Sequence, residues 1–391
     1  MHNNSDFTRV TITTKKSNHA KKFGKLIFDD GTVLDGQGFG YSTTVFGEIV
    51  FNTGMVGYTE ALTDPSYNGQ ILTLTYPLVG NYGVPDPTIV DADGIPKFFE
   101  SDKIQARGLV VHELSLTASH WNLFMTLDEW MHNEKIPGIS GIDTRELTKK
   151  LRTGGVMMAA LVVSDSEINV DDVKMQLKSA THYDSEQFMD DVSTKEEKIF
   201  GDAENTVVVI DTGAKHAILR NIRDIGYKVV LLPWNTPYEK IMSYNPKGIV
   251  LSSGPGDPQK CPDTIDTAKK LIEDNIPTLG ICLGAQIIGI AGNTETYKLK
   301  YGHRGQNKPC VNLENNQVYV TSQNHGYGIT PESLEKSDFN LWFTNADDKT
   351  VEGIKHKTKK CIAVQFHPEA APGPYDCKFI FEELKELMEK Q

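Results

Sequence analysis

Cysteine is scarce in this chain, and long apolar runs are missing. The five cysteines are odd in number and include no Cys-x-x-Cys pair, so neither a zinc ribbon nor a secreted disulfide framework is expected. All of them lie in the second half of the sequence: Cys261, Cys282, Cys310, Cys361 and Cys377. No apolar run approaches the ~18 residues of a membrane-spanning helix. These absences predict a protein of a reducing compartment, with no metal site and no membrane partner.

An excess of positive charge is also missing. The 391 residues carry a formal net charge of −12, which argues against binding to nucleic acids and to anionic membrane surfaces. Residues 1–25 are polar and lysine-rich, with Arg9 as their single arginine, and they lack the apolar segment of a secretory signal. We expect a disordered tail over residues 1–23. The expected location is cytoplasmic, with a mitochondrial address as the alternative.

The stretch 276–292 reads IPTLGICLGAQIIGIAG and is the strongest indication of chemistry. Thr278–Ile281 has the length of a short strand, and a helix-like apolar stretch follows Cys282. A strand that turns sharply into a helix with a nucleophile at the corner is a nucleophile elbow. Gly280 and Gly284 permit close backbone packing there. A helix N-terminus favours thiolate, and its N–H groups can bind an oxyanion.

Cys282 alone is equally consistent with a buried structural cysteine, since free cysteines are among the most buried residues. The choice depends on a base and an orienting acid elsewhere in the chain. Cys361–Glu369 (CIAVQFHPE) supplies both, because Ile362–Phe366 has strand character and His367 lies just past its end. Alternate side chains of an extended segment point the same way, so Glu369 can hold the imidazole. Together with the elbow, this pattern favours a Cys-His-Glu triad over a surface His-Pro turn.

From residue 205 onward, strand-like and helix-like segments alternate. Thr206–Ile210 is a continuous apolar run, typical of a strand buried on both faces. The further predicted segments are His216–Ile225 (helix), Lys228–Leu232 (strand), Gly248–Leu251 (strand), Asp263–Asp274 (helix) and Thr278–Ile281 (strand). This alternation predicts an α/β fold, with an open, mostly parallel sheet and flanking helices. Function in such sheets lies at the carboxyl ends of the strands, where Asp211, Gly254 and Cys282 fall.

The first half predicts a mixed α+β domain over residues 24–163, without a clear nucleophile–base pair. Its predicted strands are Leu26–Asp29, Thr32–Leu34, Glu48–Thr53, Gln70–Thr75 and Ala106–Val111. Apolar spacing predicts a helix over His120–Asn133, and a capping sequence predicts another from Thr144 through Leu151. Residues 164–204 are polar and acidic, so we interpret them as a linker with one helix near Val170–Ser179. The second domain then covers residues 205–391.

Two polar loops are weaker candidates for a site. Gly254–Pro258 (GPGDP) lacks the Lys-Ser/Thr of a phosphate-binding P-loop, so an N–H offered to an oxyanion is the better interpretation. Gln323–Tyr327 (QNHGY) combines hydrogen-bonding side chains with a glycine, but by itself it is more typical of a polar turn. Ser66 alone is an ordinary turn residue. His303 and Arg304 lie in a glycine-flanked loop and are consistent with solvation or with an interface.

Taken together, Gly-Ile-Cys-Leu-Gly-x-Gln around Cys282, the His-Pro-Glu after Phe366 and the Gly-Pro-Gly-Asp-Pro loop resemble the motifs of class I glutamine amidotransferases. Over roughly Gly24 to Leu387 the chain is similar to the small, glutaminase subunit of glutamine-dependent carbamoyl phosphate synthetase. The further segments that carry this resemblance are Phe51–Gly83, Gly141–Arg152, Asp211–Lys215, Tyr301–Pro309 and Ser322–Gly328. The elbow marks only the broad superfamily, whereas the N-terminal segments are specific to this subunit.

The resemblance implies a role for each matching position. Cys282 would attack the side-chain amide carbon of glutamine, His367 would move the proton, and Glu369 would orient His367. The backbone N–H groups of Leu283 and Gly256 would hold the oxyanion. The positions that match glutamine-binding residues are Ser66, Gly254, Gly256, Leu283, Gln286, Asn324, Gly326 and Tyr327.

The same resemblance implies a partner. Ammonia would pass to a large synthetase subunit or domain, docked by the N-terminal half, that makes carbamoyl phosphate for arginine or pyrimidine synthesis. ATP and Mg²⁺ would belong to that partner, and this chain would need no cofactor. Two positions depart from the family: Gly54 replaces a frequent serine, and Ala285 replaces a frequent histidine. The alternatives are a stand-alone γ-glutamyl Cys hydrolase and a non-catalytic regulatory scaffold of the same fold.

Overall fold

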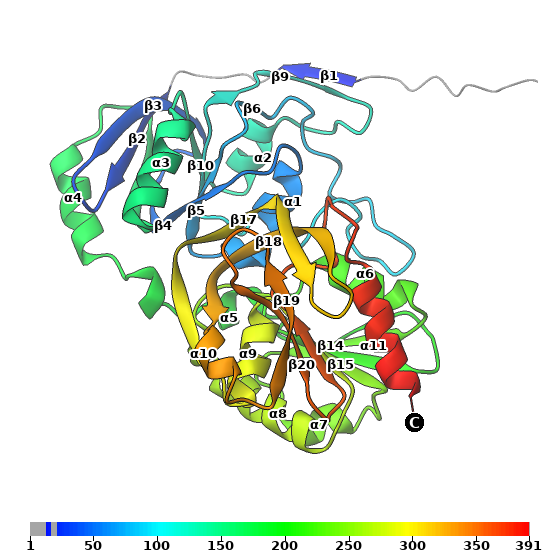
Figure 1. Cartoon of the computed structure of the whole chain (residues 1–391). Coiled ribbons are helices and arrows are strands. Elements are labelled where there is room, and N and C mark those ends of the chain that lie inside the picture. The colour runs from blue at the N-terminus through cyan, green and yellow to red at the C-terminus, as the bar shows by residue number, and fades with distance from the viewer. Residues whose placement is uncertain (1–12, 17–21, 391) are drawn as a thin grey trace, which may run out of the picture.

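The computed structural model describes residues 13–16 and 22–390, which form a barrel and a large sheet with flanking helices (Figure 1). The closed barrel has the strand order β10-β3-β2-β11-β4-β5-β7. Its strands are β2 (Lys22–Phe28), β3 (Val33–Gly40), β4 (Thr44–Asn52), β5 (Gln70–Leu74), β7 (Gly108–Val110), β10 (Pro137–Ser140) and β11 (Met157–Ser164). The hairpin predicted around Asp30-Gly31 is confirmed as the antiparallel β2–β3 pair. Closure leaves this sheet without an exposed edge.

Short elements surround the barrel. β1 (Thr13–Lys16) pairs with β9 (Thr117–His120), and β6 (Leu78–Val79) pairs with β8 (Glu113–Leu114). Three further pieces are helical: α1 (Tyr58–Thr63), the 3-10 turn η1 (Pro65–Tyr67) and α3 (Thr144–Gly154), which starts at its predicted cap. The disordered tail predicted for residues 1–23 falls mostly on 1–12 and 17–21, outside the described residues. The prediction did not foresee the strand at Thr13–Lys16.

The helix predicted over His120–Asn133 is wrong in its first half. α2 spans only Leu127–Asn133, because a capping box sets its start. The Thr126 side chain accepts the backbone N–H of Glu129, whose carboxylate in turn accepts the N–H of Thr126. The residues before it form β9 and a turn, and Trp121 stays 60% exposed. Helical spacing of apolar residues therefore did not correspond to a buried face here.

Residues 164–204 do more than connect the barrel with the large sheet. They contain α4 (Val170–Ser179), at its predicted position, followed by η2 (Tyr183–Ser185), α5 (Met189–Val192) and β12 (Lys198–Phe200). Tyr183, Phe188 and Met189 are buried in the same hydrophobic core as strands of the large sheet. This segment is therefore packed against the second domain rather than solvated along its length.

The large sheet has ten strands in the order β12-β14-β13-β15-β16-β21-β20-β19-β17-β18. The strands after β12 are β13 (Thr206–Asp211), β14 (Lys228–Pro233), β15 (Gly248–Leu251), β16 (Thr278–Ile281), β17 (Thr296–Asn312), β18 (Gln317–Ile329), β19 (Phe339–Asn345), β20 (Val351–His356) and β21 (Cys361–Val364). Parallel pairing, as predicted, holds from β14 to β21. Beyond β21 the sheet continues with antiparallel strands, which the sequence analysis did not foresee.

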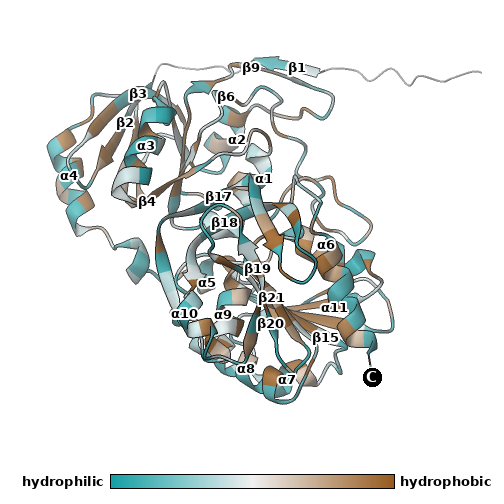
Figure 2. Cartoon of the chain, in the orientation of Figure 1, coloured by the Kyte–Doolittle hydropathy of each residue, from teal (hydrophilic) through white to brown (hydrophobic). Residues whose placement is uncertain are grey.

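Helices cover both faces of the parallel strands, and the interior strands are the most hydrophobic part of this domain (Figure 2). Val208 and Ile210 of β13 share one core cluster with α8 and α9, whereas Val207 and Val209 share another with α6 and α11. The helices of this domain are α6 (His216–Asp224), α7 (Tyr238–Met242), α8 (Pro262–Glu273), α9 (Leu283–Ala291), α10 (Pro331–Leu334) and α11 (Phe379–Glu389). Alternate side chains of each parallel strand thus enter two separate cores. Within the described residues, no helix is long and apolar enough to cross a membrane.

Candidate active site

A sharp turn presents Cys282 between β16 and α9. Its backbone lies at φ 54° and ψ −104°, a conformation that L-residues rarely adopt. Glycines make the turn possible, since a Cβ on Gly284 would lie 2.1 Å from the carbonyl oxygen of Leu251. The Cys282 N–H donates to the carbonyl of Val364 at 2.9 Å, which ties the corner to the neighbouring strand. The structure thus has the strand–nucleophile–helix geometry that the sequence pattern predicts.

His367 follows the end of β21, the strand beside β16. Its Nδ1 lies 2.6 Å from Oε1 of Glu369, and both side chains are buried. Because Nδ1 donates to the carboxylate, Nε2 is the atom that can exchange a proton with a substrate. That Nε2 is buried without a hydrogen-bond partner among the described residues. The pair therefore has the geometry of a base and its orienter.

The charges of the neighbouring groups favour a protonated His367. Burial lowers the pKa of His367, but the negative charges of Glu369 and Cys282 outweigh it and raise that pKa to about 10. Burial likewise opposes ionisation of Glu369, and the cations Lys215 and His367 reverse this, so the pKa of Glu369 falls to about 2. At neutral pH the pair is therefore an imidazolium held by a carboxylate.

Lys215 is a residue that the sequence analysis quoted within Asp211–Lys215 but assigned no role. Its Nζ lies 3.1 Å from Oε1 of Glu369, and its side chain is only 4% exposed. Lysine is almost never buried unless it is paired. The position of Lys215 just after the parallel strand β13 was the signal in the sequence that it could lie in the site. The same carboxylate oxygen thus accepts from both Lys215 and His367, which fixes the orientation of the acid.

Replacing Lys215 by methionine is expected to weaken both the fold and the site. Breaking a buried ion pair by removing one partner costs about 3–5 kcal/mol, and the pKa of Glu369 rises when its cation is lost. Glu369 contributes stability above its unfolded pKa that is lost as pH falls through its depressed folded pKa. In Lys215→Met this loss begins at a higher pH, so the acid-unfolding midpoint moves upward.

Circular dichroism between pH 2 and 8 measures that midpoint. The control is Lys195→Met, because the Lys195 side chain is 68% exposed and pairs with Asp190 at 3.9 Å on the surface. An unchanged midpoint in Lys215→Met, equal to that of the control, would mean that the Lys215–Glu369 pair does not stabilise the folded protein.

The two backbone N–H groups predicted to hold an oxyanion differ in their partners. Leu283 is the first residue of α9, so its helix offers no carbonyl for its N–H. The Gly256 N–H donates to the phenol oxygen of Tyr183 at 3.1 Å. In this structure Tyr183 is therefore the partner of the Gly256 N–H. The sequence analysis missed Tyr183, because it lies in the segment interpreted as a linker.

One pocket gathers most of the predicted binding residues around the thiol. Its lining includes Cys282 together with seven of the predicted positions, which are Ser66, Gly254, Gly256, Gln286, Asn324, Gly326 and Tyr327. Leu283, His367 and Glu369 do not line it. The carbonyl of Tyr327 accepts from Nε2 of Gln286 at 2.9 Å, and Gln365 Nε2 lies 3.7 Å from the Cys282 sulfur. Gln365 is a further residue that sequence reasoning missed.

The N-terminal domain contributes to this pocket through Ser66 of η1 as well as through Glu48 and Gln70 of the barrel strands. Asp64 accepts the Ser66 N–H at 2.9 Å with one carboxylate oxygen and the side-chain amide of Asn324 at 3.0 Å with the other. The Ser66 hydroxyl itself is buried without a hydrogen-bond partner among the described residues. A buried hydroxyl that is left unpaired costs free energy, so a polar ligand atom in this pocket would gain a ready partner.

Opposite charges also line the pocket. Lys298 on β17 lies 2.7 Å from Oε1 of Glu48 on β4 and also pairs with Asp184, so it joins the barrel, the connecting segment and the sheet. Arg304 is 4% exposed, and its Nε has no partner among the described residues. A pocket with a buried carboxylate and a buried guanidinium suits a zwitterion.

The two departures from the family pattern lie in different places. Gly54 packs closely, since a Cβ there would lie 3.0 Å from both the Asn52 side-chain oxygen and the Gln306 side chain. Ala285 is 2% exposed and belongs to the hydrophobic core beneath the elbow. Nothing in the structure explains the choice of alanine there.

Comparisons with known protein families assign both parts of the chain. Residues 208–387 match the class I glutamine amidotransferase family, and residues 26–161 match the CPSase domain of the carbamoyl-phosphate synthase small chain. The first match places residues 208–387, which include the turn at Cys282, in the class I glutamine amidotransferase family.

Similar proteins with curated names identify a narrower family within this class. Carbamoyl phosphate synthase small chains from Pyrococcus furiosus and Saccharolobus solfataricus are 44% and 43% identical, each over 94% of this chain and 98% of the relative. The small chain from Methanopyrus kandleri is 42% identical over 92% of this chain and 97% of its own length. A solved structure from Thermoplasma acidophilum, provisionally described as part of a GMP synthase, is 25% identical with a TM-score of 0.42, over 48% of this chain and 96% of that one. This chain belongs to the carbamoyl phosphate synthase small chain family.

Proposed function

We propose that the chain hydrolyses glutamine to glutamate and ammonia and delivers the ammonia to a synthetase that makes carbamoyl phosphate. The observation that carries this proposal is the buried Lys215–Glu369–His367 relay beside a cysteine held at a nucleophile elbow. The names of the relatives, and their similarity over nearly the whole chain, support the same activity.

In the first half of the reaction, the Cys282 thiolate attacks the side-chain amide carbon of glutamine. The new C–S bond forms while the carbonyl electron pair moves to oxygen, where the N–H groups of Leu283 and Gly256 hold it; one such donor contributes about 10²–10³-fold in rate. The oxyanion then collapses and the C–N bond breaks. Nε2 of His367 gives its proton to the leaving nitrogen, so ammonia departs and a glutamyl thioester remains.

In the second half, water replaces ammonia. Neutral His367 takes a proton from the water, whose oxygen attacks the thioester carbon through a second oxyanion. The C–S bond breaks, which restores the thiolate beside the protonated imidazole, and the new γ-carboxyl group loses the second proton of the water to solvent as glutamate leaves. Glu369 keeps its negative charge throughout, which stabilises His367 when it is protonated, and Lys215 holds that carboxylate in place.

The pocket lining supports recognition of a free amino acid. Ser66, Gln286, Asn324 and the backbone at Gly254, Gly326 and Tyr327 are the proposed contacts of glutamine. Glu48 and Arg304 also line the pocket and are the proposed partners of the α-amino and α-carboxylate groups, with Glu48 shared between the substrate and Lys298. Because Tyr183 bonds to Gly256, binding of the substrate oxygen requires that phenol to shift or to share its donor.

The proposed partner is a large synthetase subunit or domain, which would bind ATP and Mg²⁺, while this chain needs no cofactor for hydrolysis. The barrel is the proposed docking domain, since the chemistry of a stand-alone hydrolase does not require it. The product would serve arginine or pyrimidine synthesis. A cytoplasmic location remains part of the proposal, supported by five buried free cysteines.

Glutamate release from glutamine by the purified chain tests the function. We expect slow hydrolysis alone and faster hydrolysis, by at least about tenfold, when a carbamoyl phosphate synthetase large subunit, ATP and bicarbonate are added, because docking would complete the site. Hydrolysis that is already fast and indifferent to the partner would favour the stand-alone hydrolase. Absence of hydrolysis under both conditions, with the fold intact, would favour the scaffold.

A further inference from the structure

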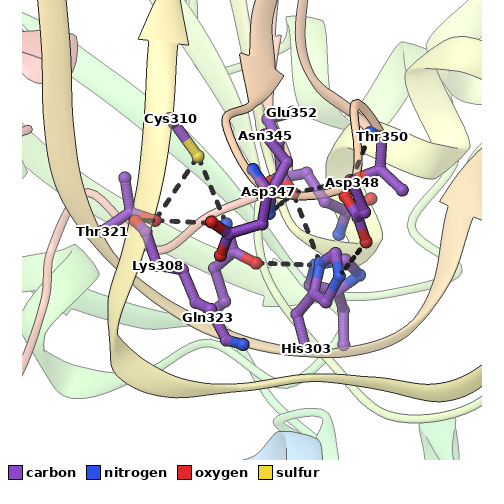
Figure 3. A network of polar contacts seen from close by, with 12 residues as sticks. His303, Lys308, Cys310, Thr321, Gln323, Asn345, Asp347, Asp348, Thr350 and Glu352 are labelled. Atoms are coloured by element: carbon purple, nitrogen blue, oxygen red, sulfur yellow. Dashed lines mark hydrogen bonds and ion pairs between the residues drawn. The ribbon is translucent and has the colours of Figure 1, made fainter.

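A second cluster of chemistry-bearing side chains lies in the antiparallel half of the sheet. It contains His303 on β17, His325 on β18 and Glu352 on β20, all of them buried. One potential ligand atom from each residue lies within 4.8 Å of the other two. Figure 3 shows His303 facing Glu352 and Asp348, within a wider network that reaches Gln323 and Cys310. The reaction proposed above uses none of these side chains.

The hydrogen bonds of His303 leave one ring nitrogen facing the cluster. Its Nε2 lies 2.8 Å from Oδ2 of Asp348, so that nitrogen donates its proton to the carboxylate. Its Nδ1 has no hydrogen bond among the described residues and lies 3.4 Å from Oε1 of Glu352. A histidine held by a carboxylate on one nitrogen and open on the other has the arrangement of a metal-ligating histidine.

His325 is likewise held by a hydrogen bond at one ring nitrogen, with its other nitrogen toward the cluster. Nδ1 of His325 donates to the carbonyl of Tyr327 at 2.8 Å, which leaves Nε2 as the lone-pair nitrogen of the neutral ring. Yet Nε2 faces Oε1 of Gln323 at 3.3 Å, which is also an acceptor.

The amide of Gln323 lies beside this contact. Its Nε2 donates to the hydroxyl of Thr321 at 3.1 Å and lies 3.3 Å from Sγ of Cys310, and that hydroxyl donates its own proton to the carbonyl of Lys308 at 2.8 Å. With the amide turned over, its oxygen would accept from the Cys310 thiol and its nitrogen would donate to Nε2 of His325. A cation at this point would therefore depend on His303, His325 and Glu352 themselves.

Glu352 completes the set of acceptors. Its side chain is fully buried, and Oε1 accepts from the side-chain amide of Asn345 at 3.1 Å. Oε2 has no hydrogen-bond partner among the described residues. A buried carboxylate oxygen without a donor is costly unless a cation meets it. The Thr350 hydroxyl also donates to Oε1 at 3.2 Å, so three side chains converge on one buried place where Nδ1 of His303 and Oε2 of Glu352 have no hydrogen-bond partner among the described residues.

We propose that His303, His325 and Glu352 bind one divalent transition-metal ion, with zinc as the favoured ion. Two imidazoles and one carboxylate are a ligand set that zinc accepts at about 2.0–2.2 Å, and the Gln323 oxygen or a water can take the fourth position. Asp348 and the Tyr327 carbonyl then act as the outer partners that orient the two rings. This inference is independent of the proposed glutaminase activity.

Such an ion would link three strands behind the substrate pocket. His325 lines that pocket together with its neighbours Asn324 and Gly326 on β18, and Arg304, which follows His303 on β17, lines it as well. The metal would thus hold the strands that carry one pocket wall, and its role is structural. Without a metal, a protonated His303 between Asp348 and Glu352 is the competing state of the same residues.

The test measures binding of zinc to the full chain in a Cys282→Ser background, so that the active-site thiol cannot hold the ion. After chelator treatment, we expect calorimetry to show one Zn²⁺ per chain, with a rise in the thermal midpoint. His303→Asn and Glu352→Gln are expected to weaken this binding at least about tenfold. The matched control is His216→Asn, since His216 also contacts a carboxylate, at 3.5 Å from Asp102, outside the cluster.

Cobalt absorption tests directly whether a metal ion binds at these side chains, which a change in stability alone would not show. Co²⁺ is expected to give visible absorption of a four-coordinate site without a thiolate charge-transfer band, and to lose it in Glu352→Gln. If His303→Asn fails to fold, Asp348→Asn replaces it, because that side chain is 45% exposed and only orients His303. Equal zinc affinity in His216→Asn and the cluster variants would overturn the proposal, as would a thiolate band that places the ion at a cysteine. Either result would leave the cluster as an ion pair centred on His303.

Discussion

Cys282→Ser is expected to abolish glutamine hydrolysis, with a loss of at least about 10⁴-fold, while the chain stays folded. Serine is nearly isosteric with cysteine, so the turn between β16 and α9 and its N–H bond to Val364 are kept. What changes is the nucleophile, because a hydroxyl beside His367 is far less ionised than a thiol. Glutamate release per chain, with circular dichroism of the same sample, measures both parts of the expectation.

The other cysteines are the matched controls for this variant. Cys310, Cys361 and Cys377 are buried and lie outside the pocket lining. Burial raises the pKa of Cys361 and of Cys377 to about 12, so neither thiol is a nucleophile at neutral pH. Serine at each of the three is expected to leave the chemistry nearly unchanged. An equal loss of activity in one of them, with the fold intact, would undo the assignment of Cys282.

Labelling separates loss of the nucleophile from loss of substrate binding. A glutamine-like electrophile should modify the parent chain once and should not modify Cys282→Ser. Labelling of that variant at another cysteine would mean that a different thiol faces the pocket. Absence of labelling in the parent chain would instead support the non-catalytic scaffold.

His367→Asn is expected to cost more activity than Glu369→Gln, about 10³-fold or more against about 10–10²-fold. Asparagine cannot exchange the proton that leaves with ammonia, so both halves of the reaction lose their acid and base. Glutamine at position 369 keeps an oxygen that can accept from His367 Nδ1 and from Lys215. It removes only the negative charge, so the orientation of the imidazole survives in part.

The pH profile distinguishes these two roles. The pKa of His367 is raised to about 10 against the opposing effect of burial, by Glu369 and by the Cys282 thiolate. In Glu369→Gln one of these negative charges is gone, so the pKa of His367 falls. The alkaline limb of kcat/KM, which reports loss of the imidazole proton, is therefore expected to move to lower pH. A larger loss in Glu369→Gln than in His367→Asn, or an unmoved alkaline limb, would mean that the roles are assigned wrongly.

Much of the α/β domain could be predicted because its signals are local. Thr278–Ile281 forms a strand within its predicted bounds, and α4 of the connecting segment lies within its own, since continuous apolar runs and capping residues act over a few neighbours. The elbow and the His-x-Glu spacing are likewise short-range patterns. The helical spacing of apolar residues before Thr126 was misleading. A capping box starts the helix at Leu127, and the predicted apolar face before it has no core against which a helix could pack.

By itself the sequence predicted Cys282, His367 and Glu369 as candidate nucleophile, base and orienter, together with the alternation of strands and helices that places them at one edge of a sheet. Only the tertiary structure decided that Lys215 pairs with Glu369, that Tyr183 bonds to Gly256, and that Glu352 faces His303. The first group of residues could be predicted because each pattern spans about ten residues or fewer. Over that length the backbone geometry fixes the direction in which each side chain points. The second group joins residues far apart in the chain, whose meeting depends on strand order and on packing between the barrel and the sheet, and no local pattern encodes those.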